Sequence, residues 1–228
     1  MNIAGKCRPK EYLLREYYNK GYKNVELYLT KQILDNRTDI IQVCKKSDIN
    51  IVAVHTPHME LDVQESMNYF KRTDLIAKEL DATLILHSNP YSTFSLINFY
   101  SPEEVEAPKF GYENHPDVSS HFINYYQIKG GFPLILDTAH LYMAEKNYLG
   151  TIKNLLENYT HKEIPIIHLN DGTKTKDGLN LGDGTLDYEC IINYIEDYNY
   201  EGYVTLEVPV AKQFDALNTV ENILDKNY

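Results

Sequence analysis

The sequence has few cysteines and no pairing pattern among them. Cys7, Cys44 and Cys190 are scattered, odd in number and without CxxC spacing. A secreted disulfide framework normally shows an even, regularly spaced set, so this pattern indicates reduced thiols in a cytosolic protein. No apolar segment follows the amino terminus as in a signal peptide, and no run reaches the roughly 18 apolar residues of a membrane helix. We therefore expect a cytoplasmic protein with no membrane partner.

Basic residues are also scarce. The chain carries 22 Lys and Arg against 33 Asp and Glu, a net charge of −11 at pH 7. Nucleic-acid affinity depends largely on Lys and Arg that neutralise phosphates, so this balance argues mildly against a nucleic-acid partner. A local basic patch on an acidic protein stays compatible with it. A bound cation would offset part of the acidity.

Short apolar runs alternate with helix-like segments along the whole chain. The eight runs are nearly continuous in apolar residues, as in parallel strands buried on both faces: Asn2–Gly5, Asn24–Leu29, Ile51–His55, Thr83–His87, Pro108–Glu113, Pro133–Asp137, Ile164–Leu169 and Tyr203–Val208. Helical spacing of apolar residues predicts helices over Pro9–Lys20, Val63–Leu80, Tyr148–Tyr159, Tyr188–Tyr198 and Phe214–Asn227. The segment Pro90–Ala107 predicts only a short helix with loop.

Eight strands alternating with helices imply a parallel sheet with right-handed crossovers. The fold class we expect is α/β, a compact single-domain (β/α)₈ TIM barrel over residues 1–228. A doubly wound open sheet is the alternative, but it often has a glycine-rich turn after its first strand. Here that turn, Gly5–Pro9, contains no GxGxxG.

Ionisable side chains end six of the predicted strands. They are His55, His87, Glu113, Asp137, His168 and Glu207. Taken singly, each is more often a solvated or hydrogen-bonded surface residue. Strand ends of a barrel converge on one mouth, however, and carboxylates gathered there repel one another unless a cation neutralises them. Imidazole and carboxylate ligands without nearby cysteine suit Zn²⁺ or Mn²⁺, so we expect a divalent metal ion.

Three local strings sharpen this expectation. They are Glu-Asn at Glu113, Asp-Thr-x-His from Asp137 to His140, and His-x-Asn-Asp from His168 to Asp171. The glycine-rich loop Leu181–Asp187 enters a helix, and capping by Thr185 or Asp187 explains it better than ligand binding does.

As an ordered set, these strings resemble the xylose isomerase-like barrels. That superfamily includes sugar and sugar-phosphate isomerases and epimerases, AP endonuclease family 2 proteins and endonuclease IV. The resemblance implies that Glu113, Asp137, His168 and Glu207 hold a metal ion. It also implies a second ion site at His55 and His87, with the choice between His55 and His58 open. Glu26 matches a glutamate that is frequent on the second strand of the family. A purely structural salt bridge in the barrel mouth would explain this residue equally well.

The resemblance separates two enzyme classes. Endonuclease IV-like proteins bind three zinc ions and carry an Asp-x-His string after the seventh strand, whereas Lys174–Gly182 contains no histidine. We therefore favour a metal-dependent sugar or sugar-phosphate isomerase or epimerase that transfers a proton through an enediolate. Glu113 and Glu207 would serve as acid and base. An endonuclease IV-like phosphodiesterase acting on abasic DNA is the alternative, and a non-catalytic sugar- or metal-binding barrel is the third reading.

The substrate partner we expect is a small sugar or sugar phosphate. His140 would orient a substrate hydroxyl, and we also expect substrate contacts from Glu26, Asn114, Asn170 and Lys174. Lys174 could meet a phosphate, although a solvated loop is the commoner role for such a lysine. The identity of the sugar, the number of ions and the oligomeric state, including a homodimer, stay open.

Overall fold

The computed structural model describes the chain apart from residues 58–62, 87–104, 118–127, 129 and 227–228. Two of the predicted metal-site histidines, His58 and His87, lie outside the described residues, as does most of the predicted short helix after the fourth strand. Among the described residues, no helix is long and apolar enough to cross a membrane.

Eight parallel strands follow the cyclic order of a closed barrel, β1-β10-β7-β6-β5-β4-β3-β2. Their bounds are β1 Asn2–Cys7, β2 Asn24–Tyr28, β3 Asn50–His55, β4 Thr83–Leu86, β5 Lys109–Glu113, β6 Leu134–Asp137, β7 Ile166–Leu169 and β10 Tyr203–Leu206. Each overlaps one of the eight predicted runs. The (β/α)₈ TIM-barrel class is therefore confirmed.

The chain falls into two compact units, one of Met1–Ile3 with Asn114–Tyr228 and the other of Ala4–Glu113. We call them the C-terminal unit and the N-terminal unit and describe each separately. The prediction of one domain over residues 1–228 stays a prediction.

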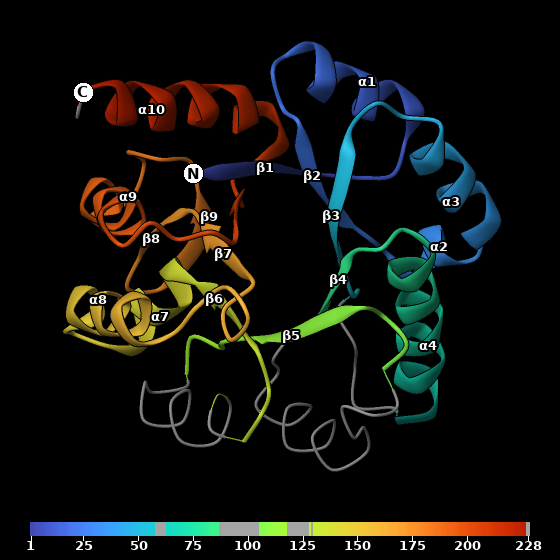
Figure 1. The fold of residues 1–228 in the computed structure, drawn as a ribbon, viewed down its shortest axis with the longest axis horizontal. Coiled ribbons are helices and arrows are strands. Elements are labelled where there is room, and N and C mark those ends of the chain that lie inside the picture. The colour runs from blue at the N-terminus through green and yellow to red at the C-terminus, as the bar shows by residue number, and fades with distance from the viewer. Residues whose placement is uncertain (58–62, 87–104, 118–127, 129, 227–228) are drawn as a thin grey trace. The chain divides into compact units, whose positions relative to one another are not determined.

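In the N-terminal unit, β2 pairs in parallel with β1 and β3, β3 pairs with β4, and β4 pairs with β5. Among the described residues of this unit, four helices accompany these strands: α1 Glu11–Asn19, α2 Lys31–Leu34, α3 Arg37–Lys45 and α4 Val63–Glu79. Helix α4 packs on β3 and β4, and α3 packs between α1 and α4 on the outside of the strands (Figure 1). Gly5 allows α1 to approach β1, because a Cβ there would lie 2.6 Å from the ring of Tyr17.

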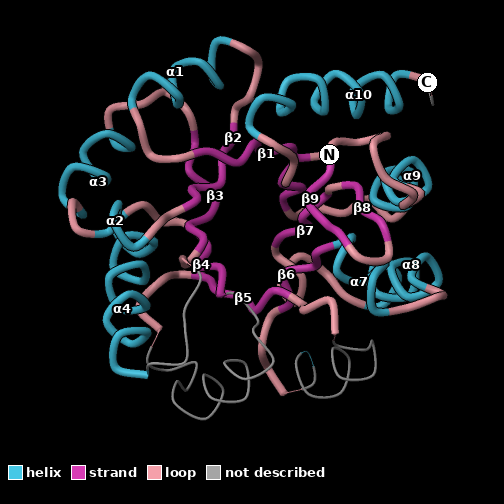
Figure 2. Tube along the Cα trace, turned by 180° about the vertical axis from the view of Figure 1, so that it is seen from behind, coloured by secondary structure: helices cyan, strands magenta, loops and turns pink. Residues whose placement is uncertain are grey.

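In the C-terminal unit, β7 pairs in parallel with β6 and β10. The helices in the described part of this unit are α7 Thr138–Ala144, α8 Tyr148–Asn158, α9 Tyr188–Asp197, the 3₁₀ turn η3 Val210–Lys212 and α10 Gln213–Asp225. Successive helices pack on one another outside the strands (Figure 2). Helix α9 buries Ile191, Ile192 and Ile195, the helical spacing that predicted it.

Two features of the C-terminal unit matter for the site. Asp187 caps α9, since its side chain accepts a hydrogen bond from the Cys190 N–H, which confirms the capping expectation. After β7 the chain forms a small antiparallel hairpin, β8 Asp171–Thr173 and β9 Lys176–Leu179, which the sequence analysis did not predict. Helices α2, α3 and α7 were not predicted either.

Candidate functional site

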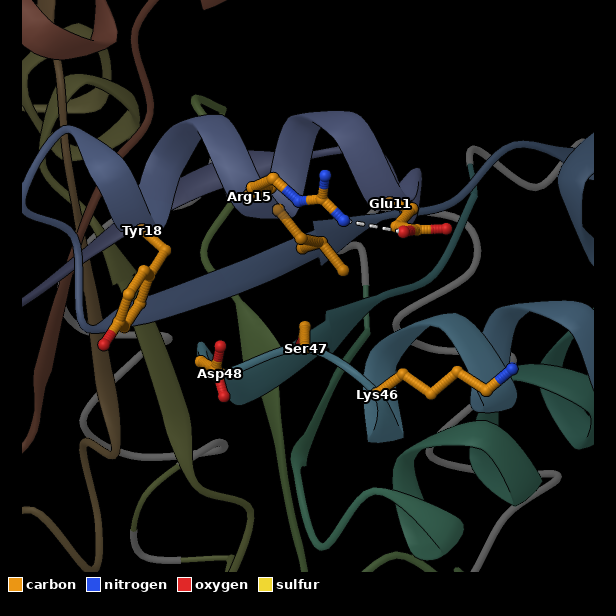
Figure 3. Close-up of a pocket in the computed structure, with 7 residues that line it drawn as sticks. Glu11, Arg15, Tyr18, Lys46, Ser47 and Asp48 are labelled. Atoms are coloured by element: carbon orange, nitrogen blue, oxygen red, sulfur yellow. Dashed lines mark hydrogen bonds and ion pairs between the residues drawn. The ribbon is translucent and has the colours of Figure 1, made fainter.

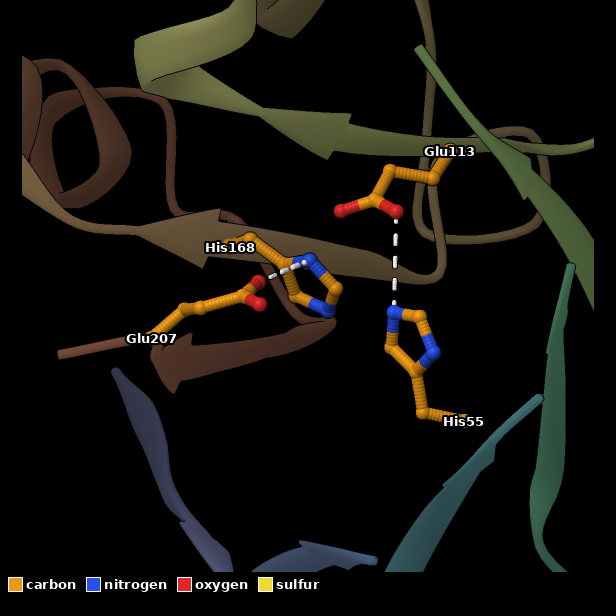
Figure 4. A group of neighbouring side chains, drawn as sticks. All are labelled: His55, Glu113, His168 and Glu207. Atoms are coloured by element: carbon orange, nitrogen blue, oxygen red, sulfur yellow. Dashed lines mark ion pairs between the residues drawn. The ribbon is translucent and has the colours of Figure 1, made fainter. Parts of the chain in front are cut away.

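Three of the four predicted metal ligands come together in the C-terminal unit. Asp137 and His168 are direct partners in the β6–β7 register, and Glu207 follows the end of β10, where its N–H donates to the Leu169 carbonyl of β7. The His168 Nδ1 lies 2.6 Å from the Glu207 Oε2 and 4.0 Å from the Asp137 Oδ2. Figure 4 shows His168 and Glu207 pointing toward one another. Parallel pairing of the strands therefore gathers these donors.

Asp137 is held firmly by its neighbours. Its Oδ1 accepts from the His140 N–H at 2.7 Å, which makes Asp137 the N-cap of α7. Its Oδ2 accepts from the Asn170 amide at 3.0 Å. The side chain of Asn114 accepts from the Asp137 N–H at 2.7 Å and donates to the Asp137 carbonyl at 3.0 Å. The two asparagines thus orient Asp137, and their predicted contact with substrate stays a prediction.

His140 lies between two hydrogen-bond acceptors. Its Nδ1 is 2.7 Å from the Asn114 carbonyl oxygen, and its Nε2 is 2.8 Å from the Asp177 Oδ2. A carbonyl and a carboxylate only accept, so both bonds form together only when both ring nitrogens carry a proton. The hydrogen bond from His140 holds the pKa of Asp177 below its usual value of 3.8, against the opposing effect of partial burial.

Asp177 is a site residue that the sequence analysis missed. It lies on β9, 37 residues after His140, and no local pattern marks it. Only the hairpin β8–β9, which brings β9 beside α7, reveals the pair.

Lys174 contacts the carboxyl end of α7. Its ammonium donates to the carbonyls of Tyr142 and Glu145, the latter at 3.1 Å. It also lies 3.7 Å from the centroid of the Tyr142 ring. A cation is favourable at a helix C-terminus and over an aromatic face. The ammonium is therefore engaged by the protein, and the predicted substrate contact of Lys174 stays a prediction.

In the N-terminal unit, His55 and Glu113 form a second buried pair. The His55 Nε2 lies 3.5 Å from the Glu113 Oε2, and both side chains are at most 2% exposed (Figure 4). The His55 Nδ1 is 2.9 Å from the Thr56 carbonyl, so Nδ1 is the protonated nitrogen. In the neutral ring, the Nε2 lone pair then faces a carboxylate, an arrangement that a cation stabilises.

Glu26 forms a salt bridge, one of the two roles that were predicted for it from the sequence. Its Oε1 lies 3.0 Å from the Lys6 Nζ, and the two residues are partners in the β1–β2 register. Glu26 is fully buried and Lys6 nearly so. Lys6 could not be singled out from the sequence, since a single lysine near the end of a strand carries no motif. The substrate contact of Glu26 stays a prediction.

Within each unit, the strand-end donors are of the chemical kind that binds a divalent ion. Each offers a histidine nitrogen or a carboxylate oxygen of the kind that metals bind: His55, Glu113, Asp137, His168 and Glu207. Four of the five are buried, and only Glu207 is partly exposed. Buried carboxylates are costly without a compensating positive charge, which protonated histidine or a metal ion supplies. Mixed nitrogen and oxygen ligands are typical of Zn²⁺ and Mn²⁺ sites.

A shallow hollow in the N-terminal unit is a separate feature. It is lined by α1 and by the turn before β3, through Glu11, Leu14, Arg15, Tyr18, Lys46, Ser47 and Asp48 (Figure 3). Its charged groups are exposed, and Glu11 pairs with Arg15 within one helix at 3.0 Å. The hollow lies beside the amino end of β3, whereas His55 ends that strand. It therefore does not belong to the strand-end donors.

Comparisons with known proteins agree with this architecture. A family model described as xylose isomerase-like TIM barrel matches residues 108–225, just over half of the chain. No curated protein matches the chain in sequence. Three solved structures illustrate the similarity of the fold.

The first is a 3-keto-D-glucoside 4-epimerase from E. coli in its apo form, with a TM-score of 0.69 and 17% identity over 97% of this chain and 99% of that one. A D-allulose 3-epimerase from Methylomonas sp., in complex with D-allulose, has a TM-score of 0.70 and 11% identity over 100% and 97%. A Thermus thermophilus protein whose structure was determined after soaking with ZnCl₂ has a TM-score of 0.71 and 16% identity over 99% of both chains. At these identities the likeness shows the fold. The strand order, the strand-end donors and the family match together establish that the chain belongs to the xylose isomerase-like TIM barrel family.

Proposed function

We propose that the protein is a divalent-metal-dependent sugar isomerase or epimerase that moves a proton on the carbon next to a carbonyl. The observation that carries the proposal is the grouping of His168 with Asp137 and Glu207 at the carboxyl ends of β6, β7 and β10. His55 and Glu113 end β3 and β5, two further strands of the barrel. Barrel enzymes build their active sites from residues at this end of the strands.

The metal ligands in this proposal are Glu113, Asp137, His168 and Glu207. When bound, a divalent ion supplies positive charge that stabilises negative charge developing on the substrate oxygens. Asp137 is suited to holding an ion because both of its carboxylate oxygens are already oriented by hydrogen bonds. His55 is the described candidate for a second ion.

Glu113 and Glu207 are the proton-transfer groups of the proposal. The reaction needs a base that takes a proton from carbon and an acid that returns one, each contributing about 10²–10⁴-fold. Glu207 fits this role because its side chain is 27% exposed, so a substrate can reach it. His168 contacts the Glu207 carboxylate at 2.6 Å and can hold a proton between the two groups. His140 and Asp177 would then meet substrate hydroxyls.

Two kinds of solved structure support this choice at the level of the fold. One relative is an epimerase of a keto-glucoside, and another binds the free ketose D-allulose. These activities belong to the relatives. For this chain, proton transfer on a ketose is therefore the first reaction to assay.

The competing proposal is a metal-dependent phosphodiesterase of the endonuclease IV type. The buried His55–Glu113 pair favours it, because a second ion would fit the clustered-metal chemistry of phosphate-ester hydrolysis. The hairpin argues against it, since its Asp177 contacts His140 where additional metal-binding histidines would be needed. Robust nicking of abasic DNA by the metal-loaded protein would reverse the ranking.

Metal analysis of the purified protein tests the first requirement. We expect one or two ions per chain and a higher melting temperature on adding Zn²⁺, Mn²⁺ or Co²⁺, since a ligand that binds the native state stabilises it. An absence of bound metal together with an absence of any thermal gain would refute the metal site.

Proton exchange tests the chemistry. Glu207→Gln should abolish solvent-deuterium incorporation into a ketose substrate while the protein stays folded, because the amide cannot accept the proton. Glu221→Gln, an exposed glutamate on α10, is the matched control and should exchange at the wild-type rate. Unchanged exchange in Glu207→Gln would remove Glu207 from the mechanism.

A further inference from the structure

We infer that the hairpin β8–β9 makes the site selective for an uncharged sugar over its phosphate ester, with Asp177 as the specificity-determining residue. The inference rests on the proposed function and narrows its substrate class. It depends on which charged groups of the hairpin face His140.

Asp177 places a carboxylate directly beside His140. Its Oδ2 lies 2.8 Å from the His140 Nε2, and its side chain is 47% exposed. The group that meets a ligand near His140 is therefore a half-exposed carboxylate. Such a carboxylate accepts hydrogen bonds from sugar hydroxyls and repels a phosphate.

Neither lysine of the hairpin offsets this charge. The ammonium of Lys174 is engaged by the Tyr142 and Glu145 carbonyls and by the Tyr142 ring. Lys176 directly precedes Asp177 in β9, and successive side chains of a strand point to opposite faces. Since Asp177 faces His140, Lys176 points the other way.

The neighbouring strand ends add further negative charge. Asp137 and Glu207 both contact His168 within the C-terminal unit. Phosphate sites in proteins usually rely on Arg, Lys or a helix N-terminus. Here the first turn of α7 is capped by Asp137 itself. One divalent ion and the protonated His140 balance the three carboxylates, so the preference rests on exposure. In the His140–Asp177 pair the carboxylate is the more exposed partner, 47% against 14% for the imidazole.

Calorimetric titration of the Mn²⁺-loaded protein with free and phosphorylated ketohexoses tests the inference. The probes are D-allulose, D-fructose and D-tagatose, each compared with its 6-phosphate. For the wild-type protein we expect each free sugar to bind about 7-fold more tightly than its ester, the effect of the single exposed carboxylate of Asp177.

The substitution Asp177→Asn tests whether the charge of Asp177 causes the preference for free sugars. Two phosphate charges about 7 Å from one carboxylate in water correspond to about a 7-fold change in affinity, so this variant should bind the 6-phosphates about 7-fold more tightly. The measurement that decides is the ratio of free-sugar to phosphate-ester affinity within the variant, which should fall about 7-fold whatever the substitution does to the binding of both ligands together. Asp225→Asn, an exposed acid on α10, removes the same charge elsewhere and should change neither affinity.

The outcomes separate this inference from the proposed function. Equal or tighter wild-type binding of the phosphate esters overturns the inference, and so does an Asp177→Asn variant that keeps the wild-type preference. A preference for free sugars that Asp177→Asn relaxes supports it, whether or not deuterium exchange occurs. Such binding without any exchange would refute the proposed isomerase alone. A failure of all six probes to bind would overturn both.

Discussion

The carboxylate of Asp171 organises the loop that follows β7, and its loss should destabilise the protein measurably. Asp171 is 1% exposed. Four backbone N–H groups donate to its two oxygens at 2.7 to 3.1 Å, those of Gly172, Gly182, Gly184 and Leu186. Each oxygen accepts two of these bonds. The hairpin that carries Asp177 and the loop that leads into α9 are therefore both hydrogen-bonded to a single buried carboxylate.

The substitution Asp171→Asn should lower the free energy of unfolding by removing acceptors for these hydrogen bonds. An asparagine has one carbonyl oxygen and one NH₂ group, so whichever way it is oriented, two backbone N–H groups face a donor and lose their acceptor. Hydrogen bonds to a charged group contribute about 1.5–3 kcal/mol each, so the two lost bonds should lower the free energy of unfolding by roughly 3–6 kcal/mol. For a domain of this size that corresponds to a fall of roughly 6–24 °C in the melting temperature.

Urea denaturation followed by circular dichroism measures the loss. Asp183→Asn is the matched control, because Asp183 is exposed on the same loop and should change stability by less than about 0.5 kcal/mol. If Asp171→Asn unfolds within about 0.5 kcal/mol of the wild-type protein, the four hydrogen bonds do not hold the loop as described, and the reasoning is wrong.

Three further predictions follow from buried groups and close contacts. Burial raises the pKa values of Cys7 and Cys44 from 9.0 to about 12, so at pH 8 only the half-buried Cys190 should react with a thiol reagent in the native protein. Because these thiols ionise more easily in the unfolded chain, stability should fall as the pH rises from 9 towards 12, which urea titrations at several pH values would reveal. Gly202→Ala should lower the unfolding free energy by about 1–3 kcal/mol, since its Cβ would lie 2.2 Å from the Tyr200 hydroxyl; an unchanged urea midpoint would show that the hydroxyl moves aside.

The barrel was predictable because its strands are apolar on both faces. Continuous runs such as Leu134–Asp137 and Ile166–Leu169 carry no strict alternation. Polar residues mark their carboxyl ends, since the first ends in Asp137 and the second is followed by Asn170. Short elements escaped prediction. Helix α2 has four residues and α7 has seven, too few for a helical period to stand out.

The site was only partly predictable. Strand-end position and the family resemblance together predicted Asp137, His168 and Glu207 as metal ligands. The structure groups these three residues in the C-terminal unit. Asp177 was out of reach, because its role depends on a hairpin whose strands have three and four residues. The ammonium of Lys174 was equally hard to place, since its partners are backbone carbonyls that no sequence motif encodes.

Asp137 and Glu207 differ in a way that divides their roles within the proposed site. Four hydrogen bonds with His140, Asn114 and Asn170 hold Asp137. Two of them involve its backbone, the other two are accepted by its carboxylate oxygens, and each contributes about 1 kcal/mol. Every oxygen of that carboxylate still has a second lone pair, so the group can bind a cation without reorganising. Glu207 follows the end of its strand and is 27% exposed. A fixed carboxylate suits the holding of an ion, and an accessible one suits proton exchange with a substrate, which is why Glu207 rather than Asp137 is the residue to substitute in a test of catalysis.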